Sequence, residues 1–352
     1  MDNLTGTGGD IGLHTCMLTV NGNPAIAYYD AIHDNLMYRR ANDANGTSWS
    51  EPITVDSTAI VGDFPSLKIV NGFPAISYYD ETNGDLKYIR ATNADGSAWG
   101  APVIVESAMD VGEHSSLQIV NGNPAIAYIA GGAQHDLRYV RANDVDGAAW
   151  GAPMMVDLSV MFVTGYITLE VVNGAPAISY CSLNTIYSVN YIRANNANGT
   201  TWATRVTVNA GTDGGWYASM KIVNGNPAIA YLNRASWDLN YVRATNITGT
   251  TWSAPVTVDA SFTTGSHCSL EIVNGNPAIS YYDETGLNLR YVRATNVSGT
   301  TWGTPISIET TGDIGQYTSL KIINGNPAVS YYDVTNTNLK YVRATDISGA
   351  AW

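Results

Sequence analysis

The segment from Ser66 to Trp99 reads SLKIVNGFPAISYYDETNGDLKYIRATNADGSAW, and its plan recurs seven times along the 352 residues of the chain. The most regular part of this plan is Asn-Gly-x-Pro-Ala, whose Asn falls at Asn21, Asn71, Asn121, Asn173, Asn224, Asn274 and Asn324. A spacing of about 50 residues is typical of repeat architectures. One such unit is too small to bury its apolar faces alone, so the seven units must pack against one another.

Each repeat contains four short stretches with β-strand character, which in the second repeat are 66–70, 74–79, 86–90 and 103–105. Asn71-Gly72 separates the first two, and Asn-Gly is a strong hairpin signal because both residues tolerate the positive φ of a type I′ turn. No window shows sustained helical periodicity. Four antiparallel strands in each of seven repeats predict an all-β chain in which residues 1–352 form one seven-bladed β-propeller.

The two ends of the chain predict how the ring closes. The last repeat stops at Trp352 without a fourth strand, whereas residues 2–12 are similar to the segment 307–315 that follows a fourth strand. We therefore expect the N-terminus to supply the outer strand of blade seven, which would remove two free sheet edges. The protein is expected to be a monomer or part of a longer chain.

Composition limits the possible partners. The formal net charge is -13 with only 17 Lys and Arg, which argues against nucleic acid or an anionic membrane surface as the main partner. No apolar run approaches the roughly 20 residues of a membrane span, so membrane insertion is not expected. No cofactor is predicted. Cys16, Cys181 and Cys268 fall on blades that are not adjacent, and we expect all three to be reduced and buried.

The turn between the third and fourth strands, for example 90–99, resembles the Asp-box hairpin of sialidases and other BNR-repeat propellers. The Asp-box acid stands two residues before Gly, whereas here Asp or Asn stands three before it, as Asn93 does before Gly96. In that family the boxes are structural. The resemblance therefore implies the fold and an extracellular or cell-surface setting, and it implies no activity.

The catalytic residues of sialidases cannot be matched. Their arginine triad has no counterpart, because one arginine recurs in the same slot of every repeat, at Arg40, Arg90, Arg141, Arg193, Arg243, Arg293 and Arg343. A residue present in every blade is expected to be architectural, and we predict that these arginines pair with the Asp or Asn of the turn.

In this topology the first strand of each repeat lies innermost, and the loops before it share one face, the top face, with the loops between the second and third strands. Just before or at the start of the first strand is an aromatic position, filled by His14, Phe64, His114, Tyr166, Tyr217, His267 and Tyr317. Four residues later on the same strand face stand Leu18, Lys68, Gln118, Glu170, Lys221, Glu271 and Lys321. The alternation of Glu and Lys over blades four to seven predicts a charge-balanced plug in the central channel.

Two further sets of polar residues map to the top face. The five histidines, which include His33 and His135, come from three blades without the short ligand spacing of a zinc site, so no metal site is predicted. Blades one, two, six and seven end their second strand with an acid, namely Asp30, Asp80, Asp283 and Asp333. We interpret these acids as a solvated row that caps loops, with a cation or basic-ligand site as the alternative.

The top loops of blades three to five depart most from the repeat and form the candidate site. They hold His114, His135, Tyr166, Tyr187, Trp216, Tyr217, Arg234 and Trp237, including the only two tryptophans outside the seven hairpin positions. Indole faces stack on sugar rings, and an arginine fork binds carboxylate or sulfate. The predicted ligand-binding set is Trp216, Tyr217, Arg234, Trp237, Tyr187 and His114, with Trp216 and Trp237 flanking Arg234.

Three functions fit these observations. The first is a recognition propeller that binds a glycan or a protein ligand near blades three to five. The second is a polysaccharide lyase or glycoside hydrolase at the channel mouth, for which His114, His135, Tyr166, Tyr217 and Arg234 have suitable acid, base and anion-binding chemistry. The third is a purely structural or adhesive module of a larger surface protein.

Overall fold

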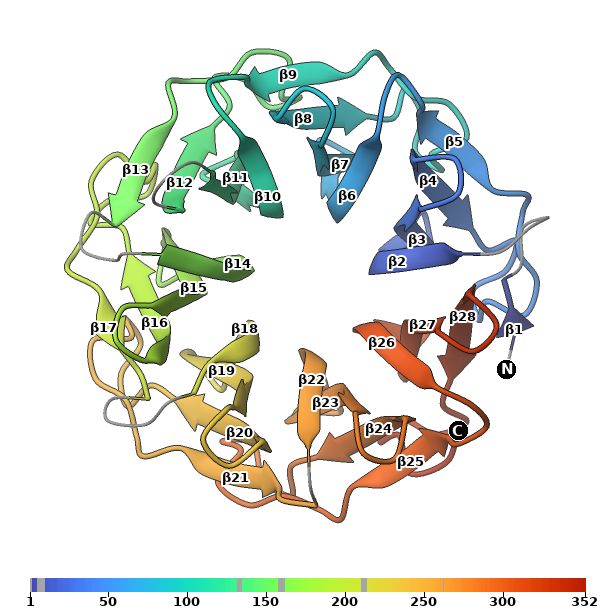
Figure 1. Cartoon of the computed structure of the whole chain (residues 1–352), viewed down its shortest axis with the longest axis vertical. Coiled ribbons are helices and arrows are strands. Elements are labelled where there is room, and N and C mark those ends of the chain that lie inside the picture. Colours follow the sequence, from blue (N-terminus) through green and yellow to red (C-terminus); the bar gives the residue numbers. More distant parts are fainter. Residues whose placement is uncertain (1, 5–9, 132–134, 158–161, 210–213, 262) are drawn as a thin grey trace.

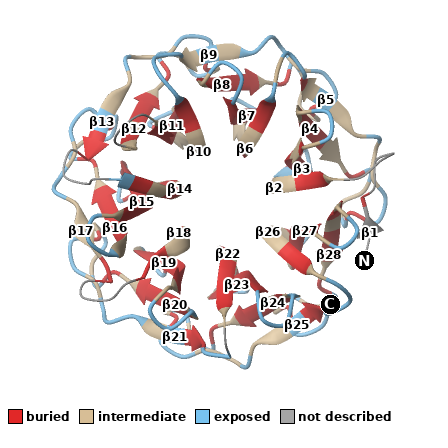
Figure 2. Ribbon diagram, in the orientation of Figure 1, coloured by how far each residue is buried: buried red, intermediate tan, exposed pale blue. Residues whose placement is uncertain are grey.

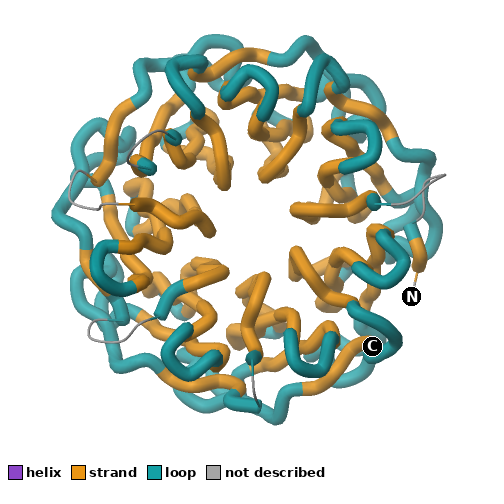
Figure 3. The backbone as a smooth tube through the Cα atoms, viewed as in Figure 1, coloured by secondary structure: helices purple, strands orange, loops and turns teal. Residues whose placement is uncertain are grey.

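The computed structural model describes residues 2–4, 10–131, 135–157, 162–209, 214–261 and 263–352. In these ranges every regular element is a β-strand, and the strands form seven four-stranded antiparallel sheets arranged as blades around a central axis (Figures 1 and 3). The predicted all-β, seven-bladed β-propeller is confirmed. No helix in the described part of the chain is long and apolar enough to cross a bilayer.

The strands follow one plan in every blade. The innermost strands are β2 (Ile11–Val20), β6 (Val61–Val70), β10 (Val111–Val120), β14 (Phe162–Val172), β18 (Trp216–Val223), β22 (Thr264–Val273) and β26 (Ile314–Ile323). The second strands are β3 (Asn23–Asp30), β7 (Phe73–Asp80), β11 (Asn123–Ala130), β15 (Ala175–Leu183), β19 (Asn226–Asn233), β23 (Asn276–Asp283) and β27 (Asn326–Asp333). The third strands are β4 (Asn35–Arg40), β8 (Asp85–Arg90), β12 (Asp136–Arg141), β16 (Tyr187–Arg193), β20 (Asp238–Arg243), β24 (Asn288–Arg293) and β28 (Asn338–Arg343). The outer strands are β5 (Ile53–Asp56), β9 (Val103–Glu106), β13 (Met154–Asp157), β17 (Val206–Thr207), β21 (Val256–Asp259), β25 (Ile306–Glu309) and, in blade seven, β1 (Asp2–Asn3).

The first hairpin of each blade has the predicted turn chemistry. In blade one, Asn21 has φ 45° and Gly22 has φ 83°, and the other six Asn-Gly pairs also have positive φ at both residues. Two consecutive residues with positive φ match the twist of the flanking strands in a type I′ turn.

The N-terminus closes the ring as predicted. Asp2 pairs with Tyr341 and Asn3 with Lys340, so β1 becomes the outer strand of blade seven. The next residue extends the contact, because the Leu4 amide donates a hydrogen bond to the Leu339 carbonyl at 3.0 Å. The Leu4 side chain is buried in an apolar cluster shared by blades seven and one.

Buried residues lie on the strands of every blade (Figure 2), and their side chains form apolar clusters between neighbouring blades. Val20 and Tyr38 of blade one pack with Leu67 and Ile76 of blade two in one buried cluster. At the opposite end from the top face, each hairpin tryptophan lies edge-on to a tyrosine of the preceding blade, as Trp99 does to Tyr38 with ring centroids 5.2 Å apart. The same contact recurs around the ring, so it joins the blades in series.

The recurrent arginines are architectural, but the predicted partner was wrong. Arg90 donates from Nε to the Val70 carbonyl at 2.9 Å and from Nη2 to the Asn71 carbonyl at 2.8 Å, and the other six arginines do the same in their own blades. The Asp or Asn three residues before the turn glycine instead bonds within its own turn, although Arg90 Nη2 also lies 3.2 Å from Oδ1 of another turn acid, Asp146 of blade three. Asp43 Oδ1, for example, accepts the Asn45 amide at 2.9 Å in an Asx turn.

Candidate functional site

The seven residues of the aromatic position form a closed ring at the channel mouth, which we call the aromatic collar. Its members are His14, Phe64, His114, Tyr166, Tyr217, His267 and Tyr317. Neighbouring ring centroids lie between 4.1 and 5.2 Å apart, including the closing pair of Tyr317 and His14 at 4.3 Å. The collar lines a cavity of about 480 Å³.

All seven collar residues have a left-handed backbone, with φ between 49° and 56°. This conformation costs a side-chain-bearing residue roughly 1–2 kcal/mol, so its surroundings must hold it. Side chains of the next blade bond several collar carbonyls, as Thr15 does to Tyr317 at 2.8 Å and Ser115 to Phe64 at 3.1 Å. Sequence reasoning identified the aromatic position but not its conformation.

The collar histidines are neutral at physiological pH. Burial lowers the pKa of His14, His114 and His267 to about 3. Beside them, burial raises the pKa of Asp63 to about 6, and its Oδ1 atom lies 3.3 Å from His14 Nε2. Among the residues that the structure describes, no three His, Cys, Asp or Glu side chains form a group suited to a metal ion.

Outside the collar, Arg234 lies among three aromatic rings, a group that we call the arginine cage. Its Cζ atom is 4.2 Å from the centroid of Tyr187 and 4.2 Å from that of Trp216. The third ring, Trp237, is 5.8 Å away and 39 % exposed. Trp216 and Trp237 thus both lie beside Arg234, as predicted, with Trp216 nearer. Tyr187, the first residue of β16 in blade four, is as close to the guanidinium as Trp216, which the sequence did not predict.

Aromatic faces hold the Arg234 guanidinium, and none of its donors is matched by an acceptor among the residues that the structure describes. It makes no hydrogen bond or ion pair with any residue in the described ranges, and its buried Nε–H has no hydrogen-bond partner there. Stacking on an aromatic ring stabilises such a cation by about 0.5–1 kcal/mol at exposed sites and more when desolvated. A preorganised guanidinium with free donors suits a carboxylate or sulfate.

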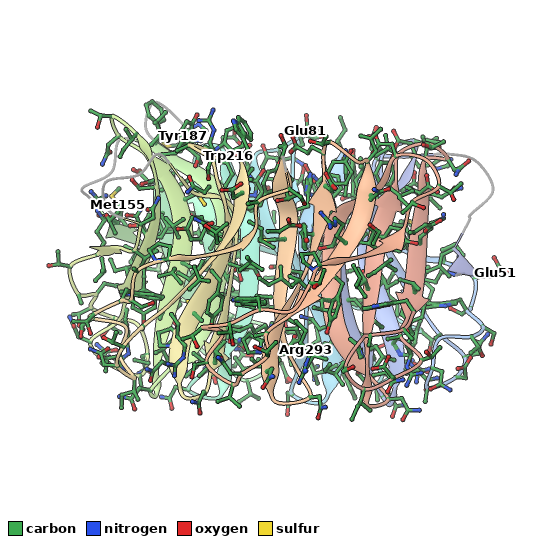
Figure 4. The ribbon with its side chains drawn as sticks, turned by 90° about the horizontal axis from the view of Figure 1, so that it is seen from below. Glu51, Glu81, Met155, Tyr187, Trp216 and Arg293 are labelled. Carbon is green, nitrogen blue, oxygen red and sulfur yellow. The ribbon has the colours of Figure 1, made fainter. Side chains whose placement is uncertain are left out.

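The cage adjoins the collar. Trp216 meets Tyr217 of the collar edge-on, with centroids 6.3 Å apart, and also meets Tyr187 at 5.5 Å and Trp237 at 6.5 Å. Figure 4 shows Tyr187 and Trp216 close together at one end of the molecule, far from Arg293. Five of the six predicted ligand-binding residues thus lie together.

The sixth, His114, lies farther around the collar and lines a second cavity of about 420 Å³ between blades three and four. His135 lines the same cavity with Glu113 and stands edge-on to Phe162, with centroids 5.9 Å apart. The residues considered for a lyase are therefore spread out. Tyr166 and Tyr217 lie in the collar between this second cavity and the cage that holds Arg234.

The acids that end the second strands cap loops as predicted, but they are buried and not solvated. Asp80 is fully buried and accepts the Asn83 amide at 3.0 Å and Asn83 Nδ2 at 2.9 Å. Its charge is compensated by Lys87 Nζ at 2.6 Å. The sequence pattern alone did not show that a cation on the third strand reaches this acid.

The cysteines also differ in one detail from the prediction. All three are free thiols, and Cys181 and Cys268 are buried, but Cys16 is only half-buried. The Leu67 amide of blade two donates to Cys16 Sγ at 3.3 Å, and serines fill the same role elsewhere, as Ser66 Oγ does for the Leu117 amide at 3.0 Å. Cys16 thus serves as an inter-blade acceptor.

No protein-family model matches the chain, and no curated protein sequence matches it. Among solved structures, it is similar to an ulvan lyase of polysaccharide lyase family PL25, with TM-score 0.64, 12% identity, and coverage of 97% of this chain and 95% of that one. It is also similar to the BP39L lectin from Burkholderia pseudomallei, with TM-score 0.68, 12% identity, and coverage of 98% and 95%. A Hadza microbial sialidase gives TM-score 0.54, 14% identity, and coverage of 93% and 74%. Identities this low show a shared propeller fold alone.

Proposed function

We propose that this protein is an extracellular or cell-surface recognition propeller that binds an anionic saccharide on its top face. The carboxylate or sulfate of the ligand would bind to Arg234. The observation that carries the proposal is the arginine cage, in which Tyr187 and Trp216 fix a guanidinium that has no acceptor among the described residues. An arginine whose orientation is already fixed loses little side-chain entropy when it binds an anion.

The surroundings of the cage favour a sugar over a simple ion. Trp237 is exposed beside Arg234 and offers an indole face to the C–H groups of a pyranose. The collar beyond Trp216 adds neutral rings with hydroxyl and imidazole groups that can bond sugar hydroxyls. The structural neighbours named a lyase, a lectin and a sialidase support a carbohydrate ligand, although at the level of fold only.

A polysaccharide lyase or glycoside hydrolase is the second candidate. The observation that favours it is the neutral state of His114 beside Tyr166, since a neutral imidazole can accept a proton. Recognition without catalysis is the simpler proposal, because His114 and His135 line a cavity on the far side of blade four from Arg234.

The proposal is tested by titrating the protein with matched carboxylated, sulfated and neutral oligosaccharides. Hydrogen bonds to a charged group are worth about 1.5–3 kcal/mol, so Arg234→Met should weaken binding of an anionic ligand by roughly ten- to a hundredfold. Arg39→Met is the matched control, because Arg39 lies in β4 of blade one and bonds the Ser50 carbonyl. Equal affinity for charged and neutral sugars would refute the proposal. Release of unsaturated, ultraviolet-absorbing product would instead establish the lyase.

A further inference from the structure

Below the collar, seven residues occupy the equivalent position of the innermost strands, one from each blade, and we call this set the channel tier. Its members are Leu18, Lys68, Gln118, Glu170, Lys221, Glu271 and Lys321. In blades four to seven the charges are paired. Lys221 Nζ lies 3.3 Å from Glu170 Oε1 and 3.6 Å from Glu271 Oε2, and Lys321 Nζ lies 3.3 Å from Glu271 Oε2. The predicted charge-balanced plug is confirmed for these four blades.

Gln118 extends the plug into blade three. Its Nε2 donates to Glu170 Oε2 at 2.9 Å, and its Oε1 accepts the Ile119 amide at 3.0 Å. Both ends of this amide are therefore already hydrogen-bonded.

Lys68 of blade two is the exception. It makes no hydrogen bond or ion pair with any residue in the part of the chain that the structure describes, although it is half-buried. Its neighbours in the tier are Gln118, which is occupied, and Leu18, which has no polar atom. The tier contains three lysines and two glutamates, so one positive charge is left uncompensated.

An uncompensated ammonium in a half-buried channel is costly. The electrostatic surroundings of Lys68 reflect this cost. Burial lowers its pKa, Glu170 partly opposes the shift, and Lys221 and Lys321 add to it. Such a group either gives up its proton or acquires a counter-ion from solution.

We propose that the central channel binds one small inorganic monoanion of the halide class beside the Lys68 ammonium, over the side chain of Leu18. One anion balances the single excess charge. Leu18 separates Lys68 from Lys321, because β2 contacts β6 through the Leu67 amide and Cys16, and contacts β26 through the Met17 amide and Ser319 at 3.0 Å. On this side of Lys68 the described tier presents a cation and an apolar group, and no carboxylate competes with an anion.

The site is independent of the arginine cage and of any saccharide. It differs from a surface ion pair in being enclosed by the inner strands, so a bound halide would be shared between blades one, two and seven. Because a ligand that binds only the folded state stabilises it, halide should raise the melting temperature in a saturable manner.

The test uses the full chain at constant ionic strength, with sodium bromide replaced stepwise by sodium gluconate, a salt of a larger organic monoanion. The wild type should melt at a higher temperature as bromide rises, with saturation. A crystal soaked in bromide should show an anomalous peak within hydrogen-bond distance of Lys68 Nζ.

Two variants remove the need for the ion by different means. Lys68→Met removes the charge, and Leu18→Glu supplies a carboxylate next to Lys68. Both should lose the bromide dependence and the anomalous peak, and Lys68→Gln replaces Lys68→Met if that variant does not fold. A bromide response that persists in both variants would overturn the proposal and place the bromide elsewhere on the protein. An anomalous map of the wild type without a peak at Lys68 would overturn it and indicate a neutral Lys68 amine.

Discussion

Lys87 joins two blades through a buried group of charges, and its replacement by Met should destabilise the protein strongly. The Nζ atom lies 2.6 Å from Asp80 Oδ2 and 3.6 Å from Asp56 Oδ2, and the side chain is only 8% exposed. Asp80 belongs to the same blade, whereas Asp56 ends the outer strand of the preceding blade and accepts the Tyr78 hydroxyl at 2.7 Å. Lys87→Met would leave two buried carboxylates without their cation.

Removal of one partner from a buried ion pair costs about 3 to 5 kcal/mol. We expect a loss near the lower end, about 3 kcal/mol at pH 7, because Asp56 and Asp80 keep hydrogen bonds from Thr58 and Asn83. Urea unfolding of wild type and variant measures this loss. The control is Asn240→Met at the equivalent position of blade five, where Asn209 replaces the acid, and it should cost less than about 1 kcal/mol.

The pH dependence gives a second readout. Burial opposes ionisation of Asp56 and Asp80, but their hydrogen bonds and Lys87 outweigh it and lower both pKa values. A lowered pKa in the folded state contributes stability above the unfolded value of about 4, and this contribution is lost as the pH falls through the folded value. In Lys87→Met the pKa values of Asp56 and Asp80 are lowered less. The loss of stability relative to the wild type should therefore shrink as the pH falls below about 4. A loss of stability under about 1 kcal/mol at pH 7, or a loss that is the same at pH 7 and below about pH 4, would refute the reasoning.

Three other experiments test the ring and the cage. Trp99→Ala should lower stability by about 2 to 3 kcal/mol in urea unfolding, below the cost for a fully buried aromatic, and an unchanged midpoint would exclude a role in inter-blade packing. Deletion of residues 1–8 should expose the edge of blade seven and cause aggregation or a lower melting temperature, whereas an unchanged monomer would show that the ring closes without β1. Trp216→Ala should weaken binding of an anionic sugar more than Trp237→Ala does, because Trp216 contacts the Arg234 guanidinium at 4.2 Å and Trp237 only at 5.8 Å. The opposite order would place the ligand on Trp237 alone.

The fold was predictable because the same local structural signals recur in all seven repeats. One Asn-Gly pair is a modest hairpin signal, but seven at regular spacing leave little room for another architecture. Ring closure was also predictable, because the missing strand at Trp352 matched a strand-like segment at the other end. The partners of the recurrent arginines were not, because backbone carbonyls leave no trace in a residue pattern, and Arg90 bonds those of Val70 and Asn71.

The candidate site was predictable in position and less so in detail. Divergence of the top loops indicated blades three to five, and the structure brings Tyr187, Trp216, Tyr217, Arg234 and Trp237 together there. Periodicity within one repeat cannot show which ring of a neighbouring blade reaches Arg234, because that depends on the angle between blades. The position of Lys68 could not be predicted for a similar reason, because only the arrangement of the tier around the axis shows that no carboxylate among the described residues pairs with it.

The left-handed backbone of the collar shows how architecture and function can be separated in this molecule. A strained backbone often marks a functional site, but here all seven collar residues share it, whether they are His, Phe or Tyr. A feature that is indifferent to the side chain must come from the packing of one blade on the next. In six of the seven blades a glycine stands two residues earlier and supports this origin, because a Cβ on Gly62 would lie 2.5 Å from the Leu36 Cα of the preceding blade. In these six blades a residue that differs from blade to blade stands between the glycine and the collar, and in blade five it is Trp216, in a place that Asp63 fills in blade two. The repeated conformation thus belongs to the architecture of the channel mouth, and under the proposed function it is the residue that varies beside the collar, Trp216 in blade five, that would contact the ligand.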